Sequence, residues 1–228
     1  MTILQHGEQK METQIASNLP QVNMITLGQF NTPLKTNDAM LWCRCCGKVA
    51  LHDYQHNACD DCAYKLSRLD KTFVPEIFRG RASKHSVEFD SQLPFLTVLG
   101  ATGTWKSHAA YELVIREAGR IFKFPHKENC ADVISQVRCS WRGQEGDETE
   151  RKIIQRIGKY PLLLLDDLGA EKINDTSISS LYLILDMRYE RKLRTVVTSN
   201  LTLAQIAERI DDRIASRLER AGKVVTLK

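Results

Sequence analysis

A glycine-containing turn between an apolar run and a helical pattern constrains this chain most strongly. The apolar run is Phe95 to Leu99, and the helical pattern begins at Ser107. The turn between them reads Gly100, Ala101, Thr102, Gly103, Thr104, Trp105, Lys106 and Ser107. It matches G-x-x-x-x-G-K-[ST] at every required position except the second glycine. A strand, such a turn and a helix, in this order, predict a loop whose backbone N–H groups surround phosphates.

Three residues of this turn carry distinct expectations. Lys106 is expected to reach the β- and γ-phosphates, and the Ser107 hydroxyl to bind Mg²⁺. Trp105 replaces the missing glycine, which costs about 1 kcal/mol if φ is positive there. Its indole could lie near the nucleotide. The alternative interpretation is a chance turn rich in glycine and threonine ahead of a helix.

A second motif supports the phosphate site. The run Leu162 to Leu165 is followed directly by Asp166 and Asp167, as in a Walker B strand. The carboxyl end of a parallel strand lies at the edge of the sheet where the phosphate loop also lies. We expect Asp166 to hold Mg²⁺ through water, and Asp167 to orient or deprotonate the attacking water. Because Asp167 is one methylene shorter than the glutamate often found in this role, we expect slow hydrolysis. The alternative is a strand that simply ends in an acidic turn.

The region around these motifs alternates between strand and helix patterns. Predicted strands cover 95–99, 121–124, 162–165 and 195–198. Predicted helices cover 107–118, with Gly119 as a stop, and 133–141, 151–157, 178–189 and 203–220. Cys130 and Cys139 fall in a helical pattern and are interpreted as packing residues. This alternation predicts an α/β fold with a parallel sheet flanked by helices.

Two C-x-x-C pairs predict a structural zinc site ahead of this region. The pairs are Cys43 with Cys46 and Cys59 with Cys62. Four thiolates complete the closed tetrahedral shell that structural zinc prefers. Neighbouring residues that could replace one ligand are Cys45, His52 and His56. We therefore expect a small zinc-ribbon-like module over 41–66 that contacts a protein or single-stranded nucleic acid.

The chain divides into four predicted parts. Residues 1–40 are polar and read as a flexible tail, 41–66 form the zinc module, 67–92 connect, and 93–228 form the nucleotide domain. The longest apolar run near the middle is too short to cross a membrane. The N-terminus lacks the pattern of a secretory signal. We expect a cytoplasmic protein without a membrane partner.

Three stretches resemble a known family: LLLLDDLGAEK, RTVVTSNLTLAQIAERI and DDRIASRL. They look like the AAA+ ATPases of the DnaC/DnaI type, which load bacterial replicative helicases, and like the IstB-type transposition helpers. The resemblance covers about 93–228. It implies that Asn200 is the sensor 1 residue and that Arg213 is an arginine finger acting on a neighbouring subunit, assisted by Arg217. DnaI-type loaders also carry an N-terminal zinc-binding domain that grips the helicase.

Basic residues concentrate near the C-terminus. From Arg188 to Lys228 there are ten basic and five acidic residues. Four arginines recur at spacings of four, four and three, which places them on one face of a continuous helix. They are Arg209, Arg213, Arg217 and Arg220. Such a stripe suits phosphate recognition between subunits, and the alternative is a solvated basic face.

The combined expectation is an ATPase that uses ATP, Mg²⁺ and Zn²⁺. It would load a DnaB-like helicase onto single-stranded DNA and form an ATP-dependent homo-oligomer. Turnover should be slow, because Trp105 departs from the family's motif and related sequences continue beyond Lys228 toward a sensor 2 arginine. Three alternatives stay open: a transposition helper, a non-hydrolysing adaptor suggested by Trp105 and Asp167, and a zinc-dependent DNA-binding protein.

Overall fold

A parallel sheet organises the part of the chain that the structure describes. This computed structural model describes residues 60–142, 148–170 and 175–228. Within these ranges lie β1 (Phe95–Gly100), β2 (Pro125–Asn129), β3 (Leu162–Leu168), β4 (Arg194–Ser199) and β5 (Gly222–Leu227). They form one sheet in the order β2-β3-β4-β1-β5, and every neighbouring pair is parallel. The predicted α/β architecture is confirmed.

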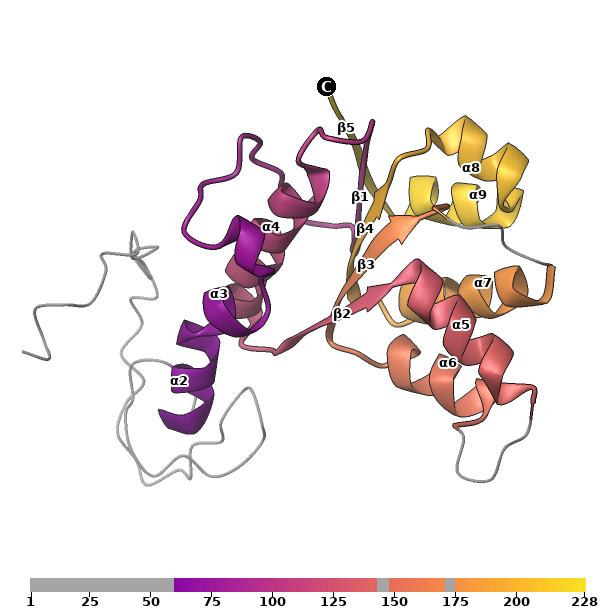
Figure 1. Cartoon of the computed structure of the whole chain (residues 1–228), viewed down its shortest axis with the longest axis horizontal. Helices are drawn as coiled ribbons and strands as arrows, with labels where there is room; N and C mark the ends of the chain where they lie inside the picture. The colour runs from indigo at the N-terminus through magenta and orange to yellow at the C-terminus, as the bar shows by residue number, and fades with distance from the viewer. Residues whose placement is uncertain (1–59, 143–147, 171–174) are drawn as a thin grey trace, which may run out of the picture. The chain divides into compact units, whose positions relative to one another are not determined.

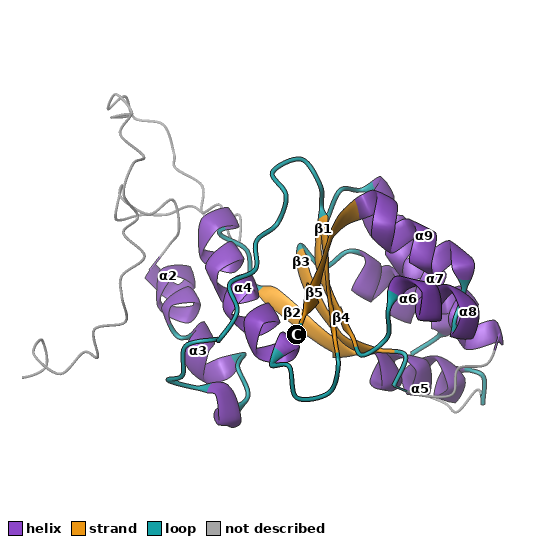
Figure 2. Cartoon of the chain, turned by 90° about the horizontal axis from the view of Figure 1, so that it is seen from above, coloured by secondary structure: helices purple, strands orange, loops and turns teal. Residues whose placement is uncertain are grey.

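Helices cover both faces of this sheet (Figures 1 and 2). One face is covered by α4 (Lys106–Ile121), on which the segment with α2 (Asp60–Ser67), α3 (Leu69–Thr72) and the 3₁₀ turn η1 (Glu76–Phe78) also packs. The other face packs against α5 (Cys130–Ser140), α6 (Glu150–Gly158), α7 (Asp175–Glu190), α8 (Leu203–Arg209) and α9 (Asp212–Ala221).

The four leucines of β3 show why its sequence is continuously apolar. Leu162 and Leu164 pack toward α4, whereas Leu163 and Leu165 pack toward the five-helix face. None of the four side chains is exposed to solvent. Strands of a parallel sheet are buried on both faces, so alternation between apolar and polar residues disappears. This burial fixes β3 inside the sheet, between β2 and β4, and Asp166 and Asp167 lie near its end.

The segment ahead of the sheet contributes to the core. Leu69, Val74 and Val87 are buried in the cluster that includes α4. The aromatic side chains of Phe73 and Phe78 pack against the same cluster. Residues 67–92, interpreted from sequence as a connecting stretch, therefore hold part of their apolar surface against the nucleotide domain.

A buried arginine ties α7 to the sheet. The Arg188 guanidinium is fully buried and donates to the carbonyl oxygens of Ile157 (3.0 Å), Tyr160 (2.8 Å) and Arg194 (2.8 Å), and to Thr195 Oγ1 (2.9 Å). Burial lowers the pKa of Arg188 to about 9. These four bonds satisfy a buried charge through backbone and hydroxyl acceptors, as burial demands.

The sequence misplaces the second strand. The strand covers Pro125–Asn129, whereas Ile121 is the last residue of α4. Phe122 follows in the left-handed conformation, with φ 51°, and its N–H donates to the Ala118 carbonyl oxygen to close the helix. Proline fits the first position of β2 because this strand lies at the edge of the sheet.

The predicted helix over 203–220 is two helices. Ile210 ends α8, and Asp211 caps α9 by accepting hydrogen bonds from the backbone N–H groups of Arg213 (2.8 Å) and Ile214 (3.2 Å). Arg209 and Arg213 thus belong to different helices, and the single four-arginine stripe is wrong. The strand β5, which follows α9, was not predicted from sequence.

Part of the predicted zinc module lies outside the described residues. The residues outside the described ranges include the predicted ligands Cys43, Cys46 and Cys59 and the alternative ligands Cys45, His52 and His56. The predicted tail 1–40 also lies outside the described residues. Cys62 lies in α2 with a buried side chain. The zinc site stays a prediction. Of the helices in the described ranges, none combines the length and the apolar character needed to span a bilayer.

Candidate nucleotide-binding site

The loop after β1 turns tightly because of its glycines. A Cβ on Gly100 would lie 2.7 Å from Thr104 Oγ1 and 2.8 Å from the Leu227 carbonyl oxygen. The Thr104 hydroxyl donates to the Ala101 carbonyl oxygen at 2.8 Å, and Gly103 has φ 87°. Only glycine fits at position 100, and glycine is favoured at 103. The sequence therefore curls the backbone directly ahead of α4.

Trp105 carries the strain of this loop. Its φ of 61° is left-handed, where a residue with a Cβ costs about 1 kcal/mol. The indole, 36% exposed, meets the Phe78 ring edge-on, with centroids 6.2 Å apart, and Lys84 Nζ lies 5.3 Å from its centroid. An aromatic pair contributes about 0.5–1.5 kcal/mol and an exposed cation–π contact about 0.5–1 kcal/mol. These contacts are of the size needed to offset the strain.

Lys106 and Asn200 meet across the sheet. Lys106 begins α4, is 8% exposed, and donates from Nζ to Asn200 Oδ1 and, at 3.4 Å, to the Ala101 carbonyl oxygen. Asn200 directly follows β4, and its Nδ2 donates to Asp167 Oδ1 at 2.9 Å. The loop lysine, the predicted sensor 1 residue and the second acid of β3 thus form one chain of hydrogen bonds.

Asp166 receives two hydroxyl groups. Ser107 Oγ donates to Asp166 Oδ1 at 3.1 Å, and Thr198 Oγ1 donates to the same oxygen at 2.6 Å. Asp166 is 9% exposed. Ser107 and Asp166 are adjacent oxygen ligands of the type that Mg²⁺ prefers. Thr198 was not predicted as a site residue, although it stands two positions before Asn200 at the end of an apolar strand.

Asp167 also has a left-handed backbone, with φ 61°. The register of β3 against β4 shifts between Leu165 and Leu168, which lets the strand turn its second acid out of the ladder. The Asp167 N–H donates to Thr198 Oγ1 at 2.9 Å. Aspartate tolerates this conformation better than most residues. The site therefore holds two strained residues other than glycine, Trp105 and Asp167.

The acids of β3 affect their buried neighbours. Burial, together with the charge of Asp166, raises the pKa of Tyr111. Burial raises the pKa of the Cys130 thiol, to which the charges of Asp166 and Asp167 add. Both groups stay protonated at neutral pH, so Cys130 is a packing residue, as predicted, and not a nucleophile. Two neighbouring carboxyl side chains at this edge of the sheet suit a bound cation.

Comparison with known proteins identifies the family. The family model described as IstB-like ATP binding protein matches residues 57–220, well over half of the chain. This chain belongs to the IstB-like ATP-binding proteins. The resemblance inferred from the sequence is confirmed at this level.

Two curated relatives and one solved structure agree with this assignment. The putative ATP-binding protein of insertion sequence IS232 from Bacillus thuringiensis subsp. berliner is 25% identical over 149 residues, 65% of this chain and only 57% of the relative. The replicative helicase loader DnaC of Buchnera aphidicola subsp. Schizaphis graminum (strain Sg) is 21% identical over 189 residues, 81% of this chain and 72% of the relative. The crystal structure of DnaI matches with a TM-score of 0.52 and 22% identity, covering 78% of this chain and 90% of DnaI. The fold is that of AAA+ P-loop NTPases.

The predicted arginine finger of this IstB-like chain makes its contacts with Asp211 and with Tyr182 of α7. Arg213 forms a 2.8 Å ion pair with Asp211 and lies over the Tyr182 ring, 4.8 Å from its centroid. Its side chain is 54% exposed. Arg217, one turn later, pairs with Asp186 and lies 4.4 Å from the Tyr189 centroid. The Arg217 side chain is 24% exposed, so Arg213 is the more accessible of the two cations.

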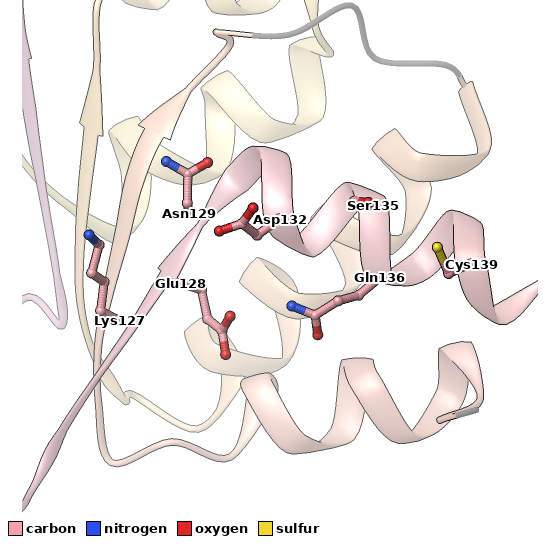
Figure 3. A pocket seen from close by; sticks show the side chains of 7 residues that line it. All are labelled: Lys127, Glu128, Asn129, Asp132, Ser135, Gln136 and Cys139. Atoms are coloured by element: carbon pink, nitrogen blue, oxygen red, sulfur yellow. The ribbon is translucent and has the colours of Figure 1, made fainter. Parts of the chain in front are cut away.

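An open pocket lies beside the candidate nucleotide-binding site, along β2 and α5 (Figure 3). It has a volume of about 650 Å³. Its lining residues are Lys127, Glu128, Asn129, Asp132, Ser135, Gln136 and Cys139. Asn129 pairs in register with Asp166, so one end of the pocket lies at the carboxyl edge of the sheet. Cys139 is exposed here, and its interpretation as a packing residue is wrong.

The donor set fits Mg·ATP. The loop glycines and the start of the 16-residue α4 offer backbone N–H groups and a helix N-terminus to an anion. Lys106 supplies a cation, while Ser107 and Asp166 supply adjacent oxygen ligands. The residues that the sequence singled out at the start of α4, on β3 and after β4 therefore converge, whereas Arg213 makes its contacts with Asp211 and Tyr182.

Proposed function

We propose that this protein is an ATPase that binds a DnaB-like replicative helicase and assists its placement on single-stranded DNA. The observation that carries the proposal is the convergence of Lys106, Ser107, Asp166 and Asn200 at one edge of the sheet. The chain also belongs to a family of ATP-binding proteins. Most of its length aligns with a protein named as a helicase loader.

The nucleotide site would work through exchange of hydrogen-bond partners. Residues 100–107 receive the phosphates, and Lys106 exchanges the Asn200 and Ala101 oxygens for phosphate oxygens. The Ser107 hydroxyl would bind Mg²⁺, and Asp166 would hold the ion through water. Bound Mg·ATP supplies a phosphoanhydride bond that water can cleave. Asp167 orients that water and accepts its proton, and Asn200, released from Lys106, keeps its hydrogen bond to this acid.

Hydrolysis by this arrangement is slow in our proposal. Trp105 imposes strain on the loop, and Asp167 places its carboxylate one methylene closer to the backbone than a glutamate would. Arg213, exposed beside Asp211, completes the site of a neighbouring subunit and stabilises negative charge on the transferring phosphoryl group. ATP then bridges subunits, so that the homo-oligomer forms when nucleotide is bound.

The zinc module would select the partner. Cys43, Cys46, Cys59 and Cys62 bind zinc, and the module over 41–66 contacts the helicase. Zinc content measured by atomic emission should fall from about one ion per chain to none in Cys43→Ser with Cys46→Ser, and helicase binding should be lost with it. The DNA-binding alternative predicts instead that this double variant loses DNA binding and keeps helicase binding.

A transposition helper is the second candidate. The observation that favours it is the 25% identity to the IS232 ATP-binding protein within the same family. In that case the ATP-bound oligomer would recruit a transposase to DNA. The two candidates share the nucleotide site and differ in the protein that the assembly recruits.

A helicase-loading assay tests the proposal. Single-stranded DNA coated with single-strand binding protein is mixed with a DnaB-like helicase, Mg·ATP and either the wild type or Lys106→Ala, and unwinding of an adjoining duplex is followed. A loader raises the rate of unwinding at least several-fold, and Lys106→Ala abolishes the rise. Lys159→Ala, an exposed lysine after α6, is the matched control. Absence of any rise with the wild type, despite measurable Mg·ATP binding, would overturn the loader assignment.

A further inference from the structure

Trp105 belongs to a small cluster that joins the phosphate loop to the segment ahead of the sheet. The cluster consists of Trp105, Phe78, His108 and Lys84. The Phe78 ring stacks on the His108 ring, with centroids 4.9 Å apart and an angle of 7°. The Trp105 ring lies 6.2 Å from Phe78 and 6.0 Å from His108, and Lys84 Nζ lies 5.3 Å from the Trp105 centroid.

Each member of the cluster is itself held. His108 is buried in the first turns of α4, and its Nε2 lies 3.0 Å from the Arg81 carbonyl oxygen. Phe78 ends η1 and also packs on Tyr111, with centroids 6.0 Å apart. Residues 78–84 are thereby attached to α4 through Phe78 and Arg81, next to the residue on which the loop turns.

The backbone of Trp105 needs such support. A left-handed conformation at a bulky residue persists when its surroundings determine it. At this position the chain has replaced the glycine that would adopt the conformation without cost. The left-handed backbone is strained because residue 105 carries the Trp105 side chain. The cluster holds this same side chain. Removing the cluster contacts would let the loop relax to conformations in which its N–H groups no longer converge.

We propose that Phe78 and Lys84 are positioning residues that hold Trp105 left-handed and so preform the phosphate loop. This inference rests on the nucleotide site of the proposed function. Affinity for the nucleotide then depends on a segment outside the loop and outside the sheet. The coupling is reciprocal, since a nucleotide that requires the preformed loop also stabilises the contacts of residues 78–84.

A double-mutant cycle tests this coupling. The dissociation constant for Mg·ATP is measured by calorimetry for the wild type, Phe78→Ala, Trp105→Gly and the double variant. Phe78→Ala should weaken binding about fivefold, equivalent to about 1 kcal/mol. In the Trp105→Gly background, where glycine needs no support, the same change should alter binding less than about twofold. Lys84→Ala should behave in the same way with a smaller effect.

Matched variants separate this role from general packing. Phe89 lies in the same segment and packs on the same core, but its ring contacts Arg194, with the guanidinium carbon 4.7 Å from the centroid. Phe89→Ala should leave the affinity for Mg·ATP unchanged at a temperature where the protein is folded. If Phe78→Ala fails to fold, Phe78→Leu keeps the apolar volume and removes the aromatic edge.

Hydrogen exchange of peptides covering 100–107 supplies a readout that needs no nucleotide. Phe78→Ala should speed exchange of this loop several-fold when Trp105 is present and leave it unchanged in the Trp105→Gly chain. Equal effects of Phe78→Ala in both backgrounds, on exchange or on affinity, would overturn the inference. If neither background binds Mg·ATP but exchange shows the coupling, the nucleotide function fails and the positioning role stands.

Discussion

Two residues other than glycine, Trp105 and Asp167, turn the chain at the candidate site, each with φ 61°. The motif flags Trp105 in the sequence because the pattern requires glycine there. Nothing in the sequence predicts the left-handed backbone of Asp167, since the Walker B pattern describes residue types and not conformation. In the sequence this aspartate looks like a shorter glutamate. Its backbone gives a second reason for aspartate, because a short polar side chain tolerates the left-handed region.

Asp167→Asn should separate nucleotide binding from hydrolysis. Asparagine also tolerates a left-handed backbone, and its Oδ1 can still accept from Asn200 Nδ2. The side chain loses its ability to accept a proton, so steady-state hydrolysis of Mg·ATP should fall about 100-fold or more. Calorimetry should find a dissociation constant within about twofold of wild type. Hydrolysis near the wild-type rate would remove Asp167 from the catalytic group.

His126 should make stability depend on pH. Burial first, and then the charges of Arg188 and Arg156, lower its pKa in the folded chain below the ordinary 6.5. Between the lowered value and 6.5 the unfolded chain binds more protons, so stability rises with pH across this window and is lost as the pH falls through it. In the wild type the His126 ring stacks on the Tyr160 ring, with centroids 3.7 Å apart. The variant His126→Phe keeps an aromatic ring for this stack, and that ring cannot be protonated.

Urea titrations at two pH values, one about a unit above 6.5 and one about a unit below it, measure this effect. The free energy of unfolding of the wild type should fall between the two values by more than that of His126→Phe. Other titrating groups contribute equally to the wild type and to His126→Phe. The difference between the two decreases in unfolding free energy is therefore the contribution of the His126 imidazole. Identical falls would mean that His126 titrates alike in the folded and unfolded chains.

At the scale of elements, apolar runs predict strands well and boundaries poorly. Three predicted strands coincide with β1, β3 and β4 because each is a buried apolar run. The arginine spacing continues across 210–211 and so suggests a single helix over 203–220. The competing signal is Asp211, a favoured helix cap. The strand β5 escapes prediction because Lys223 and Thr226 interrupt its apolar pattern at exposed positions.

Two glycines that sequence patterns cannot distinguish should respond oppositely to alanine. Gly119 lies inside α4 with open space where an added Cβ would stand, and alanine there should stabilise the protein by about 0.5–1 kcal/mol. A Cβ on Gly222 would overlap the backbone of Phe95, where β5 pairs with β1. Alanine there should destabilise by about 1–3 kcal/mol.

Urea denaturation of Gly119→Ala and Gly222→Ala provides the comparison. The interpretation of Gly119 as a helix stop is wrong, because α4 continues to Ile121 and Gly119 is not among the described glycines with a positive φ. A neutral or destabilised Gly119→Ala protein would contradict the place of Gly119 inside the helix, because such a loss is expected of a helix-ending glycine with a left-handed backbone. A Gly222→Ala protein as stable as the wild type would contradict the close approach of β5 to β1.

At the scale of the whole molecule, the parallel order of the strands brings the site together. The sequence predicts that the loop and the acids meet, since parallel strands end at a common edge, and the family resemblance adds Asn200 to them. It does not predict that Thr198 joins Asp166 and Asp167, because that contact depends on the register shift in β3. The predicted arginine finger differs in kind, since Arg213 would act only on nucleotide bound to a second copy of the chain.

Mixing two inactive variants should restore hydrolysis if Arg213 acts on a neighbouring subunit. Lys106→Ala lacks a working nucleotide site but keeps Arg213, whereas Arg213→Ala keeps the site and lacks the finger. Each variant alone should hydrolyse Mg·ATP at less than about one hundredth of the wild-type rate, because an arginine finger contributes about 10³–10⁵.

In an equimolar mixture, random association pairs an intact site with an intact finger at about a quarter of the interfaces. Hydrolysis should therefore recover to about a quarter of the wild-type rate when the two proteins are mixed at assembling concentrations. Arg209→Ala, changed on the neighbouring helix α8, is the matched control and should retain full activity alone. A mixture that stays inactive, although light scattering detects assembly, would mean that Arg213 does not act across the interface. Full activity of Arg213→Ala alone would mean that hydrolysis needs no arginine at this position.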